Sequence, residues 1–360
     1  MCDIKNEYED SDDDTLSLSG LSDLSNIDQP CNIDYIPWSE YYRPSNINDI
    51  ISHSRIKQTI KEYIKTGTFP HLMFYGPPGT GKTSTIRAFA KEFYGVNYDF
   101  MVLEINASEN RGIDVVRQDI KNFILSTPNF RGKIEKDIKL IILDEADHLT
   151  IDAQGILRHT IEKYTKFARF SIICNEKSKI IPAIESRTTS MRFPPIEDKI
   201  IIHTIKNIVK FRNLEIDDEC INILVKVSNG DLRYMLNKLQ ALYMEITDMK
   251  ITTSIVSRSC GYPSTYDIKQ IVKIMENKDN FNINKKIKKF QEYVKENRLI
   301  FANIILELAR YRYEHIINSK NVTPEDIKIF QIMADIEISM CYIDNEDIHL
   351  RVLVASYQKN

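Results

Sequence analysis

A chain of 360 residues, 42% of them hydrophobic and 28% charged, is long enough to bury two or three separate cores. No run approaches the 18 apolar residues of a membrane span, and the acidic N-terminus lacks the basic and apolar segments of a secretory signal. The six cysteines are scattered without a CxxC pair, which argues against a zinc site or a disulfide framework. We therefore expect a soluble intracellular protein that makes no membrane contact.

The first 34 residues differ in composition from the rest of the chain. They hold ten acidic residues and one lysine, a net charge of −9, so residues 35–360 carry +6 of the total of −3. A segment with so few apolar groups cannot offset the entropy cost of ordering, which predicts a disordered acidic tail over 1–34. The tail is either a solubilising segment or a short partner-binding or phosphorylated one. The basic remainder permits contact with nucleic acid without requiring it.

From residue 53 the pattern alternates between helix and strand. Ile56, Ile60 and Ile64 recur every four residues, which predicts a helix with one apolar stripe. Four short apolar runs predict strands, and helical stretches separate them: strands at His71–Tyr75, Met101–Glu104, Leu140–Leu143 and Phe170–Cys174, helices at 83–93, 112–125 and 152–164. This order predicts a parallel sheet covered by helices on both faces.

After Pro195 the strand pattern stops. Residues 196–247 predict three helices, and 264–358 is again almost wholly helical by period. Gly261-Tyr262-Pro263 is a natural break between these two helical regions.

The residues after the first predicted strand match the phosphate-binding pattern GxxxxGK[ST]: Gly76, Pro77, Pro78, Gly79, Thr80, Gly81, Lys82 and Thr83. A chance match in a chain of this size has odds of roughly one in a hundred, and the position between a strand and a helix lowers those odds. Backbone N–H groups of such a loop close around phosphates at a helix N-terminus. We expect Lys82 to hold the β/γ-phosphates of ATP, Thr83 to place its hydroxyl on Mg²⁺, and contacts to continue to Ser84.

A second motif places acids directly after four apolar residues, in the stretch Leu140-Ile141-Ile142-Leu143-Asp144-Glu145-Ala146-Asp147. A buried strand with this ending delivers carboxylates to the edge of the sheet beside the phosphates. Asp144 is expected to bind Mg²⁺ directly or through water, and Glu145 to act as the general base for the attacking water. Asp147 is a candidate cap for the following helix.

Several further stretches, in order and spacing, resemble the sequence boxes of replication factor C small subunits. They are Pro37-Trp38-Ser39-Glu40-Tyr41-Tyr42-Arg43-Pro44, the phosphate loop, residues 106–117 (NASENRGIDVVR), the Asp-Glu-Ala-Asp acids, Ile173-Cys174-Asn175, Ser186-Arg187-Thr188 and Asn229-Gly230-Asp231-Leu232-Arg233. The resemblance is dense from about Ile36 to Phe193 and fades in the C-terminal helices.

The resemblance implies an α/β AAA+ P-loop core over 35–195, a small helical lid over 196–262 and an all-α C-terminal collar over 263–360. It also implies an ATPase subunit of a five-membered ring of clamp-loader subunits. Such a ring places a sliding clamp on primer–template DNA during replication, in the nucleus, or in the cytoplasm if the source is viral or archaeal.

Carried over residue by residue, the resemblance implies further site residues. Asn175 resembles a sensor at a strand end, and Arg233 a second sensor that reaches from the lid to the phosphates. Arg187 resembles the arginine finger that acts in trans on ATP of the adjacent subunit. The segment with Ser39, Tyr42 and Arg43 resembles the one that closes the adenine pocket.

Some positions depart from the family pattern. Thr188 stands where a cysteine usually follows the finger arginine, and His159 replaces the second arginine of an Arg-Arg pair. The change at His159 weakens the case for basic contacts from that helix, and we expect no role for this histidine.

Sequence-independent DNA contacts are expected at Arg111 and Arg117, at the start of a predicted helix, where arginines can follow a phosphate backbone. The alternative is that both arginines pair with nearby acids such as Asp114. The lysine run at 285–289 is either a solvated helix face or a DNA site.

Two other functions remain open at this point: another AAA+ machine, such as a branch-migration motor or a checkpoint-type loader subunit, and a purely structural ring member.

Overall fold

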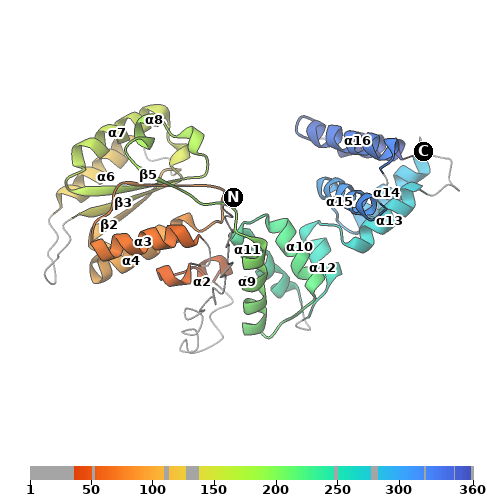
Figure 1. The fold of residues 1–360 in the computed structure, drawn as a ribbon, viewed down its shortest axis with the longest axis horizontal. Helices are drawn as coiled ribbons and strands as arrows, with labels where there is room; N and C mark the ends of the chain where they lie inside the picture. The colour runs from red at the N-terminus through yellow and green to blue at the C-terminus, as the bar shows by residue number, and fades with distance from the viewer. Residues whose placement is uncertain are drawn as a thin grey trace, which may run out of the picture. The chain divides into compact units, whose positions relative to one another are not determined.

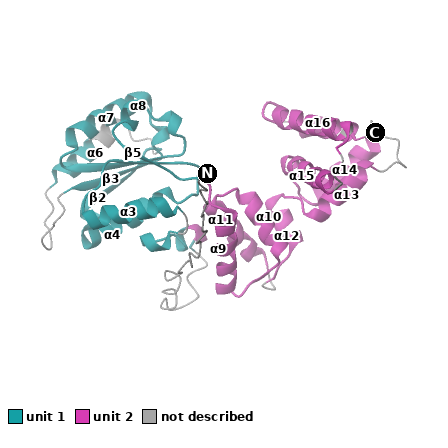
Figure 2. Ribbon diagram, viewed as in Figure 1, with its two compact units in different colours: residues 1–36, 40–194 teal, residues 37–39, 195–360 magenta. Residues whose placement is uncertain are grey.

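The computed structural model describes residues 36–50, 53–108, 113–126, 138–246, 250–276, 283–319, 322–343 and 345–357. The chain divides into two compact units, unit 1 with residues 1–36 and 40–194 and unit 2 with residues 37–39 and 195–360 (Figure 2). Among the described residues, no helix combines the length and apolarity that a membrane span requires.

Unit 1 is built on a five-stranded parallel sheet with strand order β2-β3-β4-β1-β5 (Figure 1). The strands are β1 Leu72–Tyr75, β2 Val102–Asn106, β3 Lys139–Asp144, β4 Ala168–Cys174 and β5 Thr189–Arg192. The described helical segments of this part of the chain are α2 Trp38–Tyr41, η3 Ile47–Asp49, α3 Ser54–Thr66, α4 Lys82–Tyr94, η4 Gly95–Asn97, α5 Tyr98–Met101, α6 Ile113–Leu125, η5 Ala146–His148, α7 Ile151–Tyr164, η6 Lys177–Lys179 and α8 Pro182–Glu185. The predicted α/β core with a parallel sheet is confirmed.

Both faces of the sheet are buried. Successive side chains of a strand point to opposite faces, so each buried strand contributes to two cores. In β3, Leu140 and Ile142 pack into the core that α3 and α4 cover, while Ile141 and Leu143 pack into the core that α6 and α7 cover. Helices lie on both sides of the sheet in Figure 1. This is why β3 reads as a continuous apolar run.

Strand β5 was absent from the sequence prediction. Of its four residues only Met191 is buried, so it carries no apolar run, and its parallel pairing with β1 identifies it instead. The expectation that strands end at Pro195 is also wrong in one detail, since β6 Glu215–Ile216 and β7 Lys250–Ile251 form a small parallel pair.

Unit 2 is otherwise helical in its described part. Its helices are α9 Asp198–Phe211, α10 Asp218–Ser228, α11 Leu232–Glu245, α12 Thr253–Cys260, α13 Thr265–Glu276, α14 Ile283–Glu296, α15 Phe301–Ser319, α16 Pro324–Met340 and α17 Glu346–Ser356. Helices α13 to α17 share one apolar core. The finer division into a lid over 196–262 and a collar over 263–360 stays a prediction.

The lysine run on α14 is split between two environments. Lys285, Lys288 and Lys289 are exposed, as a solvated face requires. Lys286 is 6% exposed, and its Nζ donates to the carbonyl oxygen of Met275 at 2.9 Å. For Lys286 the expectation of a solvated position is therefore wrong, because the side chain binds a carbonyl at the end of α13, where a cation is favourable.

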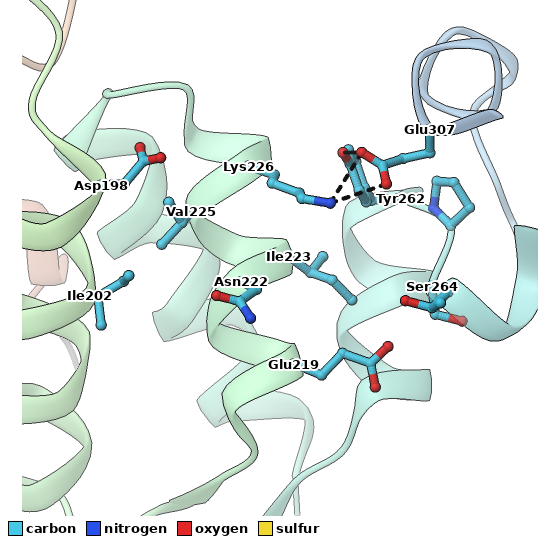
Figure 3. Close-up of a pocket in the computed structure, with 12 residues that line it drawn as sticks. Asp198, Ile202, Glu219, Asn222, Ile223, Val225, Lys226, Tyr262, Ser264 and Glu307 are labelled. Atoms are coloured by element: carbon cyan, nitrogen blue, oxygen red, sulfur yellow. Dashed lines mark hydrogen bonds and ion pairs between the residues drawn. The ribbon is translucent and has the colours of Figure 1, made fainter. Parts of the chain in front are cut away.

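A cavity of about 280 Å³ lies within unit 2, between α9, α10 and the segment 262–265 (Figure 3). Glu307 of α15 also lines the cavity and accepts hydrogen bonds from Lys226 of α10 and from the Tyr262 hydroxyl. None of the predicted ATP-site residues lines this cavity.

Candidate functional site

The predicted phosphate loop connects β1 to α4, and its backbone requires glycine at the first position. Gly76 has φ +144°, and a Cβ atom there would lie 2.0 Å from the carbonyl oxygen of Phe193. The adjacent Phe193 N–H donates to Tyr75 O at 2.8 Å, so the segment after β5 fixes the start of the loop. Gly81, the residue before α4, also has positive φ. Only a residue without a side chain allows β5 and the loop to approach this closely.

Lys82 is the first residue of α4, and its side chain extends back to the carbonyl groups at the start of the phosphate loop. It is 7% exposed, and its Nζ donates to the carbonyl oxygens of Gly76 and Pro77 at 2.8 Å each and to Asn175 Oδ1 at 2.9 Å. Since β4 lies between β1 and β3 in the sheet, a residue that follows β4 falls between the loop and the acids that end β3. The predicted sensor Asn175 and the predicted phosphate-binding lysine are therefore in direct contact.

Thr83 and Asp144 are also brought together, although 61 residues separate them in the sequence. The Thr83 hydroxyl donates to Asp144 Oδ2 at 2.8 Å, and Asp144 Oδ1 accepts from the backbone N–H of Glu145 at 2.9 Å. A hydroxyl and a carboxylate oxygen at one point are ligands that Mg²⁺ uses, and Mg²⁺ commonly takes its other ligands from water and substrate phosphates. These residues fit the predicted Mg²⁺ site.

Glu145 follows the sheet edge in a left-handed backbone conformation, with φ 55° and ψ 37°. Such a conformation is uncommon for a residue other than glycine, asparagine or aspartate, and it is found at functional sites more often than elsewhere. The side chain is half-buried and lies one residue from Asp144.

Asp147 has a different position from the one expected. The N-cap of α7 is Thr150, whose side chain accepts from Ala153 N, so the prediction of Asp147 as the helix cap is wrong. Asp147 Oδ2 instead accepts from the backbone N–H groups of Asn175 and Glu176, at 3.2 and 3.4 Å. It thereby connects the segment after β3 to the predicted sensor Asn175 after β4, a contact that the sequence pattern did not indicate.

A second contact that sequence analysis missed supports the loop from α3. His53 Nε2 lies 3.2 Å from Thr80 O, and its ring packs edge-on against Phe193 with centroids 4.9 Å apart. Burial lowers the pKa of His53, which the bond to the Thr80 carbonyl partly opposes. No local signal could have found this residue, because it lies outside the motif by more than 20 positions.

Of the remaining predicted residues, Arg187 belongs to unit 1 and Arg233 to unit 2. Arg187 lies in the turn after α8 and is bonded within unit 1 to Ala183, Ser186 and Glu162. Arg233 is exposed in the first turn of α11 in unit 2, where the Asp231 side chain caps the helix. The tight turn before it requires Gly230, since a Cβ atom there would lie 2.5 Å from Pro195 Cβ.

The adenine-pocket residues are divided between the units. Ser39 belongs to unit 2, in which the adjacent Trp38 is fully buried and its backbone N–H donates to Gln240 Oε1 at 2.8 Å. Tyr42 and Arg43 belong to unit 1, and Arg43 pairs with Glu40 at 2.7 Å. Their contact with adenine stays a prediction.

The DNA contacts of Arg111 and Arg117 stay predictions. Arg111 lies outside the described residues, and Arg117 lies on α6 at a position whose side chain is not described.

The chain is similar to known ATPases and to replication factor C subunits. Residues 72–195 match the family model of the ATPase family associated with various cellular activities (AAA). A probable replication factor C subunit 5 of Dictyostelium discoideum is 42% identical over 323 residues, which cover 90% of each chain. Replication factor C subunit 5 of Homo sapiens is 39% identical over 342 residues, 94% of this chain and 96% of the relative.

Replication factor C subunit 3 of Schizosaccharomyces pombe is 44% identical over 248 residues, 69% of this chain and 70% of the relative. Among solved structures, the Thermotoga maritima RuvB Holliday junction branch migration motor is similar at a TM-score of 0.48 and 16% identity, covering 79% of this chain and 100% of that one. A likeness of this size does not bear on function. Identity near 40% over nine-tenths of the length shows the family, and this chain belongs to the family of replication factor C small subunits.

Proposed function

We propose that this chain is an ATP-hydrolysing subunit of a clamp loader that places a sliding clamp on primer–template DNA. The observation that carries the proposal is the pair of contacts at the sheet edge, Lys82 with Asn175 and Thr83 with Asp144, in a chain of this family. These contacts support the proposal because they join the four residues to which phosphate binding, metal binding and sensing are assigned. A purely structural ring member would not need this set of residues.

Each residue has a defined part in binding and hydrolysis. The backbone of Gly76–Gly81 encloses the phosphates of ATP, and Lys82 binds the β/γ-phosphates with its ammonium group. Thr83 and Asp144 would hold Mg²⁺, which when bound neutralises phosphate charge. Glu145 accepts the proton of the attacking water. Asn175, which Asp147 and Lys82 hold from two sides, orients this water or the γ-phosphate.

Other parts of the proposal come from the family. Ser39, Tyr42 and Arg43 close the adenine pocket, and Arg233 connects the position of the lid to the nucleotide. Arg187 stabilises the charge on the γ-phosphate of the adjacent subunit in a five-membered ring. Arg111 and Arg117 follow the DNA backbone without reading its bases.

Co-purification with candidate partner subunits, followed by ATPase assays, tests the proposal. We expect the assembled complex to hydrolyse ATP slowly alone and faster when a sliding clamp and primed DNA are both present. Stimulation by DNA without any clamp, together with strand unwinding or translocation, would contradict clamp loading and favour a motor.

A further inference from the structure

The proposed arginine finger is bound to its own subunit. Arg187 Nη2 pairs with Glu162 Oε1 at 2.6 Å, and Nη1 donates to the carbonyl oxygen of Ala183 at 2.7 Å. Glu162 lies near the end of α7, which packs beside α8 in unit 1 (Figure 1). A guanidinium that is to reach the nucleotide of another subunit must first leave this carboxylate.

Glu162 has a second guanidinium within reach. Arg158 lies one helical turn before it on the same face of α7, with its Nε 3.9 Å from the same Glu162 oxygen. This Nε is buried and has no hydrogen-bond partner among the described residues. A buried N–H without a partner is unfavourable, so a small turn of Glu162 toward Arg158 would gain a hydrogen bond. Glu162 would therefore keep a cationic partner if Arg187 left.

The strength of the pair suits a reversible contact. The side chains of Arg187 and Glu162 are 38% and 40% exposed. Ion pairs with this exposure contribute little to stability, whereas an arginine that meets the charge developing on a γ-phosphate is worth far more. Glu162 can therefore bind Arg187 when no phosphate competes, but a γ-phosphate would displace Glu162 from Arg187.

We propose that Glu162 is a positioning residue that exchanges between Arg187 and Arg158. In one state it retains Arg187 on its own subunit, and in the other it binds Arg158 and releases Arg187 toward the adjacent ATP. The exchange restrains hydrolysis at the adjacent site until the interface closes. This inference rests on the proposed trans role of Arg187.

The test uses the assembled complex, with this chain also carrying Glu145→Gln so that its own site contributes little to turnover. Glu162→Gln removes the carboxylate charge and should raise hydrolysis without DNA or clamp by about 1.5- to 5-fold, the effect that an exposed ion pair can have. Arg158→Met removes the alternative guanidinium and should slow hydrolysis by a similar factor; it leaves the imidazole of His159, 3.7 Å from Glu162, in place. The double variant should behave like Glu162→Gln alone.

Glu185→Gln is the matched control. Glu185 has a similar exposure, 41%, and pairs with Lys177 instead of Arg187. This variant should leave hydrolysis at the adjacent site unchanged. Nucleotide affinity of this chain, measured by titration, should also be the same in every variant, because none of these residues touches the Lys82 cluster in the described structure.

Arg187→Ala distinguishes a failure of the trans role of Arg187 from a failure of the exchange at Glu162. If that variant leaves the adjacent site at full rate, the trans role itself is wrong. If Arg187→Ala suppresses hydrolysis while Glu162→Gln has no effect or slows it, the trans role stands and the exchange is overturned. A fall in the thermal midpoint of Glu162→Gln together with slower hydrolysis would assign Glu162 a merely structural part.

Discussion

Three oxygen atoms orient the ammonium group of Lys82: the carbonyls of Gly76 and Pro77 and the Asn175 side chain. Lys82→Ala removes this buried cation, so ATP affinity should fall at least tenfold, about 1.4 kcal/mol. Titration with a fluorescent ATP analogue measures this. Lys91→Ala, at an exposed position of the same helix, serves as the control and should bind normally. Equal ATP affinity in the two variants would show that Lys82 does not contribute to ATP binding.

Glu145 is the residue for which binding and hydrolysis should separate. Glu145→Gln keeps the size of the side chain and its hydrogen-bonding reach but cannot accept a proton. Hydrolysis in the assembled complex should slow by roughly 10² to 10⁴ while ATP still binds. Single-turnover hydrolysis and a binding titration on the same sample distinguish these effects. Turnover at the normal rate would assign the general base to another group.

At the scale of elements, the sequence predicts those parts of the site that a single segment contains. The phosphate loop is contiguous between β1 and α4, and the acids directly follow the apolar run of β3, so spacing and periodicity suffice for both. The contacts of Asp147 and His53 could not be predicted, because their partners come from other elements. Strand β5 was missed because an edge strand with one buried residue carries no apolar signal.

The contact between β1, β4 and the end of α7 contains a buried histidine that makes stability depend on pH. His71 is 8% exposed, its Nδ1 accepts from Phe170 N at 3.1 Å, and its Nε2 lies 3.3 Å from the Thr165 hydroxyl. Burial, with a smaller contribution from the nearby Arg169, lowers its pKa to about 4. The unfolded chain therefore binds a proton near pH 6.5 that the folded chain does not bind until about pH 4.

Above pH 6.5 the titration of this histidine therefore does not lower the free energy of unfolding. As pH falls from 6.5 to 4 it destabilises the fold, by roughly 3 kcal/mol at the end of that range. His71→Asn keeps an acceptor for Phe170 N and removes the titration. Its free energy of unfolding, measured by denaturant at several pH values, should fall less steeply over this range. His203→Asn changes an exposed histidine of α9 and should retain the original slope. Equal slopes in all three proteins would exclude His71 as the source.

At the scale of the whole molecule, some contacts join segments so distant that only a family resemblance could suggest them. Lys82 and Asn175 are 93 positions apart, and periodicity carries no information about such a pair. The resemblance named both residues. It included Asp147 without indicating its contact with residues 175 and 176, and it did not indicate Glu162 or Glu307. These three residues act through contacts with other elements, which neither motif spacing nor hydrophobic pattern records.

Glu307 connects two helical parts of unit 2. On α15 it is 13% exposed and accepts from Lys226 of α10 at 3.1 Å and from the Tyr262 hydroxyl of the intervening segment (Figure 3). It also accepts from Arg310 at 2.7 Å. Burial alone would raise the pKa of Glu307, but the hydrogen bonds from Tyr262 and Lys226 outweigh it, and the pKa is lowered. The carboxylate therefore stabilises the fold above its ordinary pKa, and this contribution is lost as pH falls through the lower, folded value.

Glu307→Gln should destabilise the protein at neutral pH by about 1–2 kcal/mol, toward the low end for charged hydrogen bonds because Lys226 and Arg310 are partly exposed. The loss should appear as a lower midpoint of denaturant unfolding and as faster amide exchange in α10 and α15, the two helices that the carboxylate joins. Glu314→Gln, at an exposed position of α15, should change neither. Because the carboxylate is neutral in acid, the difference between wild type and Glu307→Gln should shrink as pH falls below the folded pKa. A difference that stays constant down to acid pH would mean that packing around residue 307, and not its charge, holds α10 and α15 together.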